Sequence, residues 1–86
     1  MNTAYFYLTD EGEKLAHKLA AAHPGDIYNK ENFKENLRAG FGRYDSLVCI
    51  MATGIVVRIL APLIVHKTSD PAVVVLDQKG KYAISL

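Results

Sequence analysis

The sequence predicts an α/β protein, a three-layer sandwich in which helices cover both faces of a mainly parallel sheet. Two runs, residues 47–51 and 72–76, are apolar throughout, as expected for strands buried on both faces. Before them lie segments 10–22 and 31–41, whose apolar residues recur at helical spacing. Strands that alternate with helices in this way pair in parallel, because each helix carries the chain back to the starting edge of the sheet.

Length and composition indicate a single domain over residues 1–86, half of whose residues are apolar. The net charge of +1 gives no electrostatic reason to expect a nucleic-acid partner. One cysteine excludes an internal disulfide, and the chain does not open like a signal peptide, so we expect a cytoplasmic protein.

Charge is concentrated in the first half of the chain. Residues 1–46 hold thirteen of the nineteen Asp, Glu, Lys and Arg residues. Those of the segment 30–38, Lys34 and Arg38 among them, are predicted to form the solvated face of an amphipathic helix. The second half of the chain is predicted to supply the interior of the sheet.

The first strand is predicted at Ala4–Leu8, which is rich in aromatic residues. A helix over 10–22 follows, with Asp10 as its N-cap, because Asp10 and Glu13 have the spacing of a capping box. A His-Pro-Gly sequence ends that helix, and the short segment 26–28 is predicted as an edge strand.

The second helix is predicted from about Glu31 to Phe41. Its Phe33, Leu37 and Phe41 are spaced four residues apart and therefore form one apolar stripe.

The stretch 47–65 allows two interpretations. It holds one charge, Arg58, and is long enough for a membrane-spanning helix. The alternative is a buried strand at Leu47–Met51, a turn at 52–54 and a buried helix. We favour the second, because the turn interrupts the run and a charge near a bilayer centre is costly. Pro62 is expected to kink or end the helix.

The turn Thr53-Gly54 is the first candidate site. It is predicted to lie at the carboxyl end of a central strand, where Thr53 caps the next helix and Gly54 permits close approach to the backbone. Open α/β sheets bind ligands at this end, and the helix dipole favours negative charge there. The alternative is an ordinary strand–helix turn that holds no ligand.

Arg58 is the second candidate, because it lies one turn beyond Gly54 and can point back toward the same end of the sheet. There its guanidinium could hold a carboxylate by paired hydrogen bonds. An exposed surface position or a structural ion pair is equally compatible with the sequence. The candidate partners for such a pair are Asp45, Asp70 and Asp77.

The C-terminal part is predicted to form a polar loop at 66–71, a strand at 72–76, a turn at 77–80 and a fifth strand at 81–86. The last two strands then form a β-hairpin. The complete order is βαβαβαββ, with a five-stranded sheet of the flavodoxin or Rossmann type.

No metal site is predicted, because His17, His23 and His66 have no ligand spacing between any two of them. Cys49 falls within a buried strand and is predicted to be an inert apolar side chain.

The second half of the chain resembles the amino-terminal domain of the CbiG family of cobalamin-biosynthesis proteins. The resemblance rests on residues 50–58 (IMATGIVVR), 61–63 (APL), 70–75 (DPAVVV), Gly80 and 84–86 (ISL), and it is dense from about residue 44 onward. Members of that family continue with a segment of the type SGHxGGAN and with further domains. The resemblance therefore implies that this chain is one domain of a longer protein.

The resemblance implies a cobalt-precorrin-5A hydrolase of the anaerobic pathway, which opens a δ-lactone ring and releases acetaldehyde. The substrate is then a cobalt corrinoid with acetate and propionate arms, and Thr53, Gly54 and Arg58 are implied to bind those arms. Cobalt would belong to the substrate, so no cofactor of the protein is expected, and the catalytic residue stays unassigned. The implied partners are the substrate and the remaining CbiG domains.

Two other functions stay open: an anion- or phosphate-binding domain of the flavodoxin type, and a scaffold without catalysis. The chain ends on a predicted strand with no helix after it. A bare sheet edge or face of that kind leads us to expect self-association into a homo-oligomer.

Overall fold

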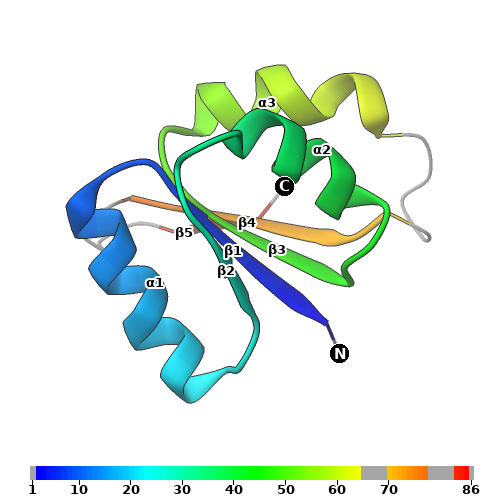
Figure 1. Cartoon of the computed structure of the whole chain (residues 1–86). Helices are drawn as coiled ribbons and strands as arrows, with labels where there is room; N and C mark the ends of the chain where they lie inside the picture. Colours follow the sequence, from blue (N-terminus) through cyan, green and yellow to red (C-terminus); the bar gives the residue numbers. More distant parts are fainter. Residues whose placement is uncertain (1, 65–69, 78–82, 86) are drawn as a thin grey trace.

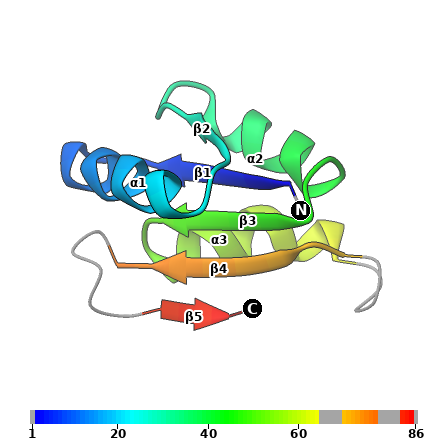
Figure 2. The ribbon, with the colours of Figure 1, turned by 90° about the horizontal axis from the view of Figure 1, so that it is seen from below.

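One five-stranded sheet runs through the computed structural model of the protein, which describes residues 2–64, 70–77 and 83–85 (Figure 1). In spatial order its strands are β2 (Asp26–Tyr28), β1 (Thr3–Tyr7), β3 (Ser46–Ile50), β4 (Ala72–Leu76) and β5 (Ala83–Ser85). The first four pair in parallel, and β5 pairs antiparallel with β4. Figure 2 shows the strands next to one another, with the arrow of β5 reversed.

Helices lie on both faces of this sheet. Helix α1 (Asp10–Ala22) covers one face, and α2 (Phe33–Phe41) and α3 (Thr53–Leu60) lie together on the other (Figures 1 and 2). A short 3₁₀ turn, η1 (Ala61–Leu63), continues α3. The predicted α/β class is confirmed, with four parallel strands and three helices. Of the predicted C-terminal turn and strand, residues 78–82 and 86 lie outside the described residues.

Strand β1 shows why both faces are covered. Ala4 and Phe6 point into the core under α2 and α3, whereas Tyr5 and Tyr7 pack against α1. All four are buried, with exposed fractions of at most 7%. Since successive side chains of a strand point to opposite faces, four consecutive buried residues require cover on both sides.

The predictions were wrong about the cap of one helix and the first residue of another. The N-cap of α1 is Thr9, not Asp10, because the Thr9 hydroxyl accepts a hydrogen bond from the Gly12 N–H at 3.0 Å. Helix α2 begins at Phe33 and not near Glu31. The Asn29 side chain accepts the Glu31 N–H at 3.0 Å, which closes a turn before the helix.

Within the stretch 47–65, the strand–turn–helix interpretation is confirmed. Helix α3 has eight residues, and the backbone tightens into η1 at Ala61, next to Pro62. Pro62 cannot donate the backbone hydrogen bond that a longer helix needs at this point, which explains why α3 stops. In the described part of the chain, no helix is long and apolar enough to cross a membrane.

Candidate functional site

The carboxyl ends of β1 and β3 mark the point at which the sheet changes its direction of winding. The chain passes from β1 to β2 on one side and then returns across β1 to form β3. Helix α1 follows β1 and helix α3 follows β3, and the two helices cover opposite faces of the sheet (Figure 1). Open α/β sheets bind ligands outside the carboxyl ends of strands at such a switch point. The predicted turn Thr53-Gly54 lies at this end.

Thr53 does not cap α3, which corrects the prediction. Ala52 occupies the N-cap position with an extended backbone, Thr53 is the first helical residue, and no side-chain hydrogen bond caps the helix within the described residues. The first turn also holds no acidic residue. In the part of the chain that the structure describes, the dipole and the first N–H groups of α3 thus have no capping side chain, an arrangement that favours an anion.

Gly54 lies within the first turn of α3 and is exposed. Beyond its chain neighbours and the backbone of its own helix, a Cβ atom built at this residue would have no atom of the described residues within 4 Å. The protein itself therefore does not require a glycine here. The free space beside Gly54 leaves room for a ligand at the helix terminus, although room alone does not identify one.

Arg58 is exposed and lies at the rim of a cavity of about 390 Å³ between α2 and α3, which we call the α2–α3 groove. The groove is lined by Leu8, Phe33, Lys34, Arg38, Ile55, Arg58 and Ile59. Arg58 shares this rim with two further cations from α2, and Thr53 and Gly54 do not line the groove. The groove thus brings Arg58 together with Lys34 and Arg38, and not with the turn.

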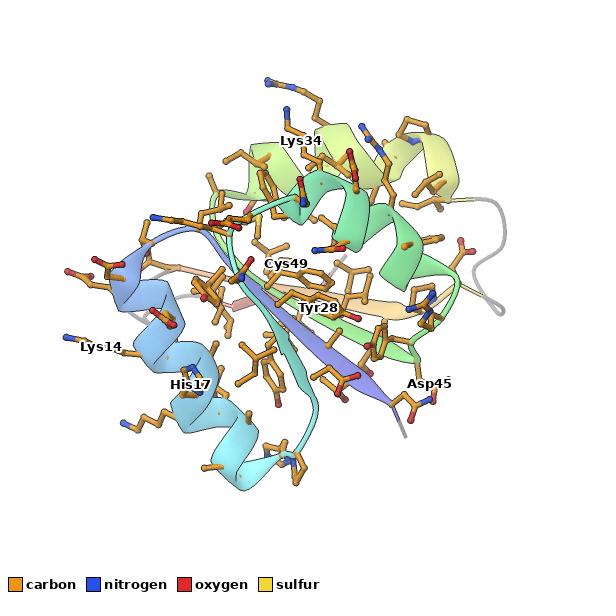
Figure 3. The ribbon with its side chains drawn as sticks, in the orientation of Figure 1. Lys14, His17, Tyr28, Lys34, Asp45 and Cys49 are labelled. Atoms are coloured by element: carbon orange, nitrogen blue, oxygen red, sulfur yellow. The ribbon has the colours of Figure 1, made fainter. Side chains whose placement is uncertain are left out.

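Lys34 and Arg38 were predicted to lie on an ordinary solvated face, and both are exposed as predicted. Their neighbour across the groove, Arg58, was not predicted. Figure 3 shows Lys34 on the outer side of the sheet, where α2 and α3 run beside one another. The spacing of four residues between Lys34 and Arg38 already indicated a shared face, but no sequence signal indicated that α3 faces it.

The alternative of a structural ion pair for Arg58 receives no support among the residues that the structure describes. The Arg58 guanidinium makes no ion pair or hydrogen bond there, and Asp45 instead accepts the backbone N–H of Asn2 at 3.1 Å. Asp70 and Asp77 each have an interaction of their own. Arg58 is therefore available to bind a ligand.

The remaining candidate groups fit structural roles. Cys49 is fully buried, and burial raises the pKa of its thiol to about 12, so it stays protonated at neutral pH. His17 lies 3.9 Å from Glu13 on the surface of α1, and His66 lies outside the described residues. Over the described ranges, no three His, Cys, Asp or Glu side chains are placed to hold a metal ion.

A polar cluster at the opposite, amino end of the sheet attaches the edge strand β2. The Tyr44 hydroxyl donates to the Asp26 carboxylate at 2.5 Å and lies 2.7 Å from the Tyr28 hydroxyl. The Tyr28 ring stacks on Phe6 at a centroid distance of 5.1 Å. These contacts explain why a strand of three residues keeps its place, and they raise the pKa of Tyr44, chiefly through the hydrogen bond to Asp26.

Comparison with known proteins supports the resemblance seen in the sequence. The model of the family described as cobalamin synthesis G N-terminal matches residues 35–86. A cobalt-precorrin-5A hydrolase of Salmonella typhimurium is 43% identical over 96% of this chain. A protein of the same name from Priestia megaterium is 48% identical over 54% of the chain.

A solved structure agrees in fold over nearly the whole chain. It is a cobalamin biosynthesis protein G homolog from Sulfolobus solfataricus, which superimposes with a TM-score of 0.80 at 26% identity over 99% of this chain. The present chain spans 27% of the Salmonella protein and 28% of the Sulfolobus chain, so it corresponds to about a quarter of each. By the family match, the sequence identity and the shared fold, this chain belongs to the family of cobalamin synthesis G amino-terminal domains.

Proposed function

We propose that this chain acts as the amino-terminal domain of a cobalt-precorrin-5A hydrolase in cobalamin biosynthesis. The observation that carries the proposal is the 43% identity to the Salmonella hydrolase over 96% of the chain. Since the chain corresponds to about a quarter of that protein, the lactone-opening reaction is proposed for the assembled enzyme. The partners of this domain are then the remaining domains of the hydrolase and the cobalt-corrinoid substrate.

Within that enzyme, the proposed contribution of this domain is to bind substrate carboxylates. The acetate and propionate arms of the corrinoid would meet Arg58 and the uncapped terminus of α3 at Thr53 and Gly54. Cationic side chains and helix N–H groups are the usual protein partners of carboxylates. Cobalt enters as part of the substrate, so the domain is proposed to need no cofactor of its own.

The finer features of the prediction belong to the same proposal. We propose that β5 and its hairpin with β4 are part of the domain fold in the whole enzyme, that the enzyme works in the cytoplasm, and that the isolated chain self-associates.

A chimera tests the proposal. In a bacterial strain that lacks its cobalt-precorrin-5A hydrolase, the corresponding first quarter of the Salmonella protein is replaced by residues 1–86 of this chain. We expect the chimera to restore cobalamin-dependent growth. A soluble chimera that accumulates normally but restores no growth would overturn the proposal.

Two further chimeras separate the alternatives. If this domain is only a scaffold, the chimera with Arg58→Ala should support growth as well as the parent chimera does. If the domain binds substrate, the same chimera should support weaker growth. The matched substitution Arg43→Ala removes an equal charge at the amino end of the sheet and should leave growth unchanged.

A further inference from the structure

We propose that the α2–α3 groove binds the carboxylate arms of an amphipathic polycarboxylate, with Lys34, Arg38 and Arg58 as its three cationic anchors. This inference rests on the proposed function and deepens it. It adds two residues of α2 to the recognition of the substrate and specifies the chemical class that the groove accepts.

The three cations converge because two helices contribute to one rim. Lys34 and Arg38 are four residues apart on α2 and therefore project from the same side of that helix. Arg58 comes from α3, which packs beside α2 on the same face of the sheet. The lining contains three positive charges and no acidic side chain, in a protein whose net charge is only +1.

In the absence of a ligand, the positive charges of these three side chains repel one another. Like charges that face one another across a helical turn destabilise a helix, and a third cation across the groove adds to the repulsion. No ion pair of these three side chains occurs within the part of the chain that the structure describes. An anion in the groove would relieve the repulsion, and its binding would therefore stabilise the fold.

The floor of the groove indicates which class of anion fits. The remaining lining residues are apolar and less exposed than the three cations, and they give the groove an apolar base: Leu8, Phe33, Ile55 and Ile59. Inorganic phosphate offers nothing to cover this base, whereas a ring system that carries carboxylates offers both an apolar edge and separated negative charges. The volume of about 390 Å³ is at the low end for a ligand pocket, so it fits arms and an edge of a macrocycle and not the whole ring.

Uroporphyrin is a suitable probe, because it is a fluorescent tetrapyrrole that carries four acetate and four propionate groups and no cobalt. Its binding to the 86-residue chain is followed by fluorescence anisotropy at low ionic strength. The test variant is Lys34→Gln with Arg38→Gln. The matched control is Lys14→Gln with Lys18→Gln, which removes two exposed charges at the same spacing from α1, on the opposite face of the sheet (Figure 3).

We expect the Lys34/Arg38 double variant to bind uroporphyrin about 3- to 20-fold more weakly than the unmodified chain, since exposed charge pairs each contribute up to about fivefold. The Lys14/Lys18 control should bind within about twofold of the unmodified chain. Raising the salt concentration should weaken binding by the unmodified chain and bring its affinity closer to that of the test variant. Circular dichroism checks that both double variants remain folded, which is expected because all four side chains are exposed.

The inference is overturned if the test and control variants lose affinity equally, if neither loses affinity, or if the unmodified chain does not bind uroporphyrin. It is also overturned if inorganic phosphate displaces uroporphyrin at equal concentration, since the groove would then recognise charge alone. Each of these results can occur while the chimera still restores growth, so failure of the groove and failure of the proposed function are distinguishable.

Discussion

Gly54→Ala is expected to stabilise the isolated domain. Gly54 lies within α3, and a methyl group at this position would meet no described residue outside its own helix within 4 Å. The substitution therefore removes conformational freedom from the unfolded chain without a clash in the folded one. An alanine that fits a helical backbone in this way adds about 0.4–1 kcal/mol to the free energy of unfolding. For a domain of this size, that is a rise of about 2–8 °C in Tm.

Gly25→Ala is the control, because the surroundings of Gly25 are crowded whereas those of Gly54 are open. A Cβ atom at Gly25 would clash with the carbonyl oxygen of Thr3, which is a backbone atom of β1 and cannot move aside without disturbing the sheet. Overpacking of this kind costs about 1–3 kcal/mol. The two substitutions should thus change stability in opposite directions.

Urea denaturation followed by circular dichroism measures both effects, with the free energy of unfolding extrapolated to water. If Gly54→Ala lowers that free energy, Gly54 does not have the helical backbone and open surroundings described above.

The same variant also tests ligand binding. A ligand that contacts the backbone at the start of α3 should bind Gly54→Ala more weakly although the fold is more stable.

Three further outcomes follow from the structure. Thr9→Ala should lower the free energy of unfolding by about 1 kcal/mol, measured by urea denaturation, because it removes the cap of α1; unchanged stability would contradict the assigned cap. Cys49 should react with a thiol reagent only as fast as the fold opens, and a fast reaction at neutral pH would contradict its burial. The fold raises the pKa of both Cys49 and Tyr44, so the folded chain keeps these two protons to a higher pH than the unfolded chain does. The free energy of unfolding should therefore keep this contribution at neutral pH and fall as the pH rises above about 9. Unfolding curves that do not change between pH 8 and 10.5 would contradict this assignment.

Hydrophobic pattern and turn residues were sufficient to predict the presence and order of the strands and helices between residues 3 and 76. The runs at 47–51 and 72–76 could be satisfied only by burial on both faces, and the four-residue spacing of Phe33, Leu37 and Phe41 fits only a helix. Helix ends were harder, because several polar residues compete for each cap. At α1 the hydroxyl of Thr9 and the carboxylate of Asp10 are both suitable groups, and in the structure Thr9 caps the helix.

Part of the candidate site could be predicted from local sequence, and part depends on contacts between residues far apart in the chain. The position of Thr53-Gly54 at the carboxyl end of β3 follows from local pattern. For Arg58 the sequence left a ligand-binding role, an ion pair and a surface position open, and the structure shows the side chain exposed. The groove does not, because the sequence does not indicate that Arg58 lies beside Lys34 and Arg38. Bringing α2 and α3 onto one face depends on the order of the strands, which the sequence left open.

The most direct test of a binding role for this domain is the steady-state kinetics of the purified chimera with enzymatically prepared cobalt-precorrin-5A. If Arg58 binds substrate carboxylates and takes no part in the chemical step, Arg58→Ala should raise KM by about 3- to 10-fold and leave kcat within about twofold. Arg43→Ala should change neither constant. A fall in kcat at unchanged KM would place Arg58 in the chemical step, and unchanged constants would reduce this domain to a scaffold; either result contradicts the account.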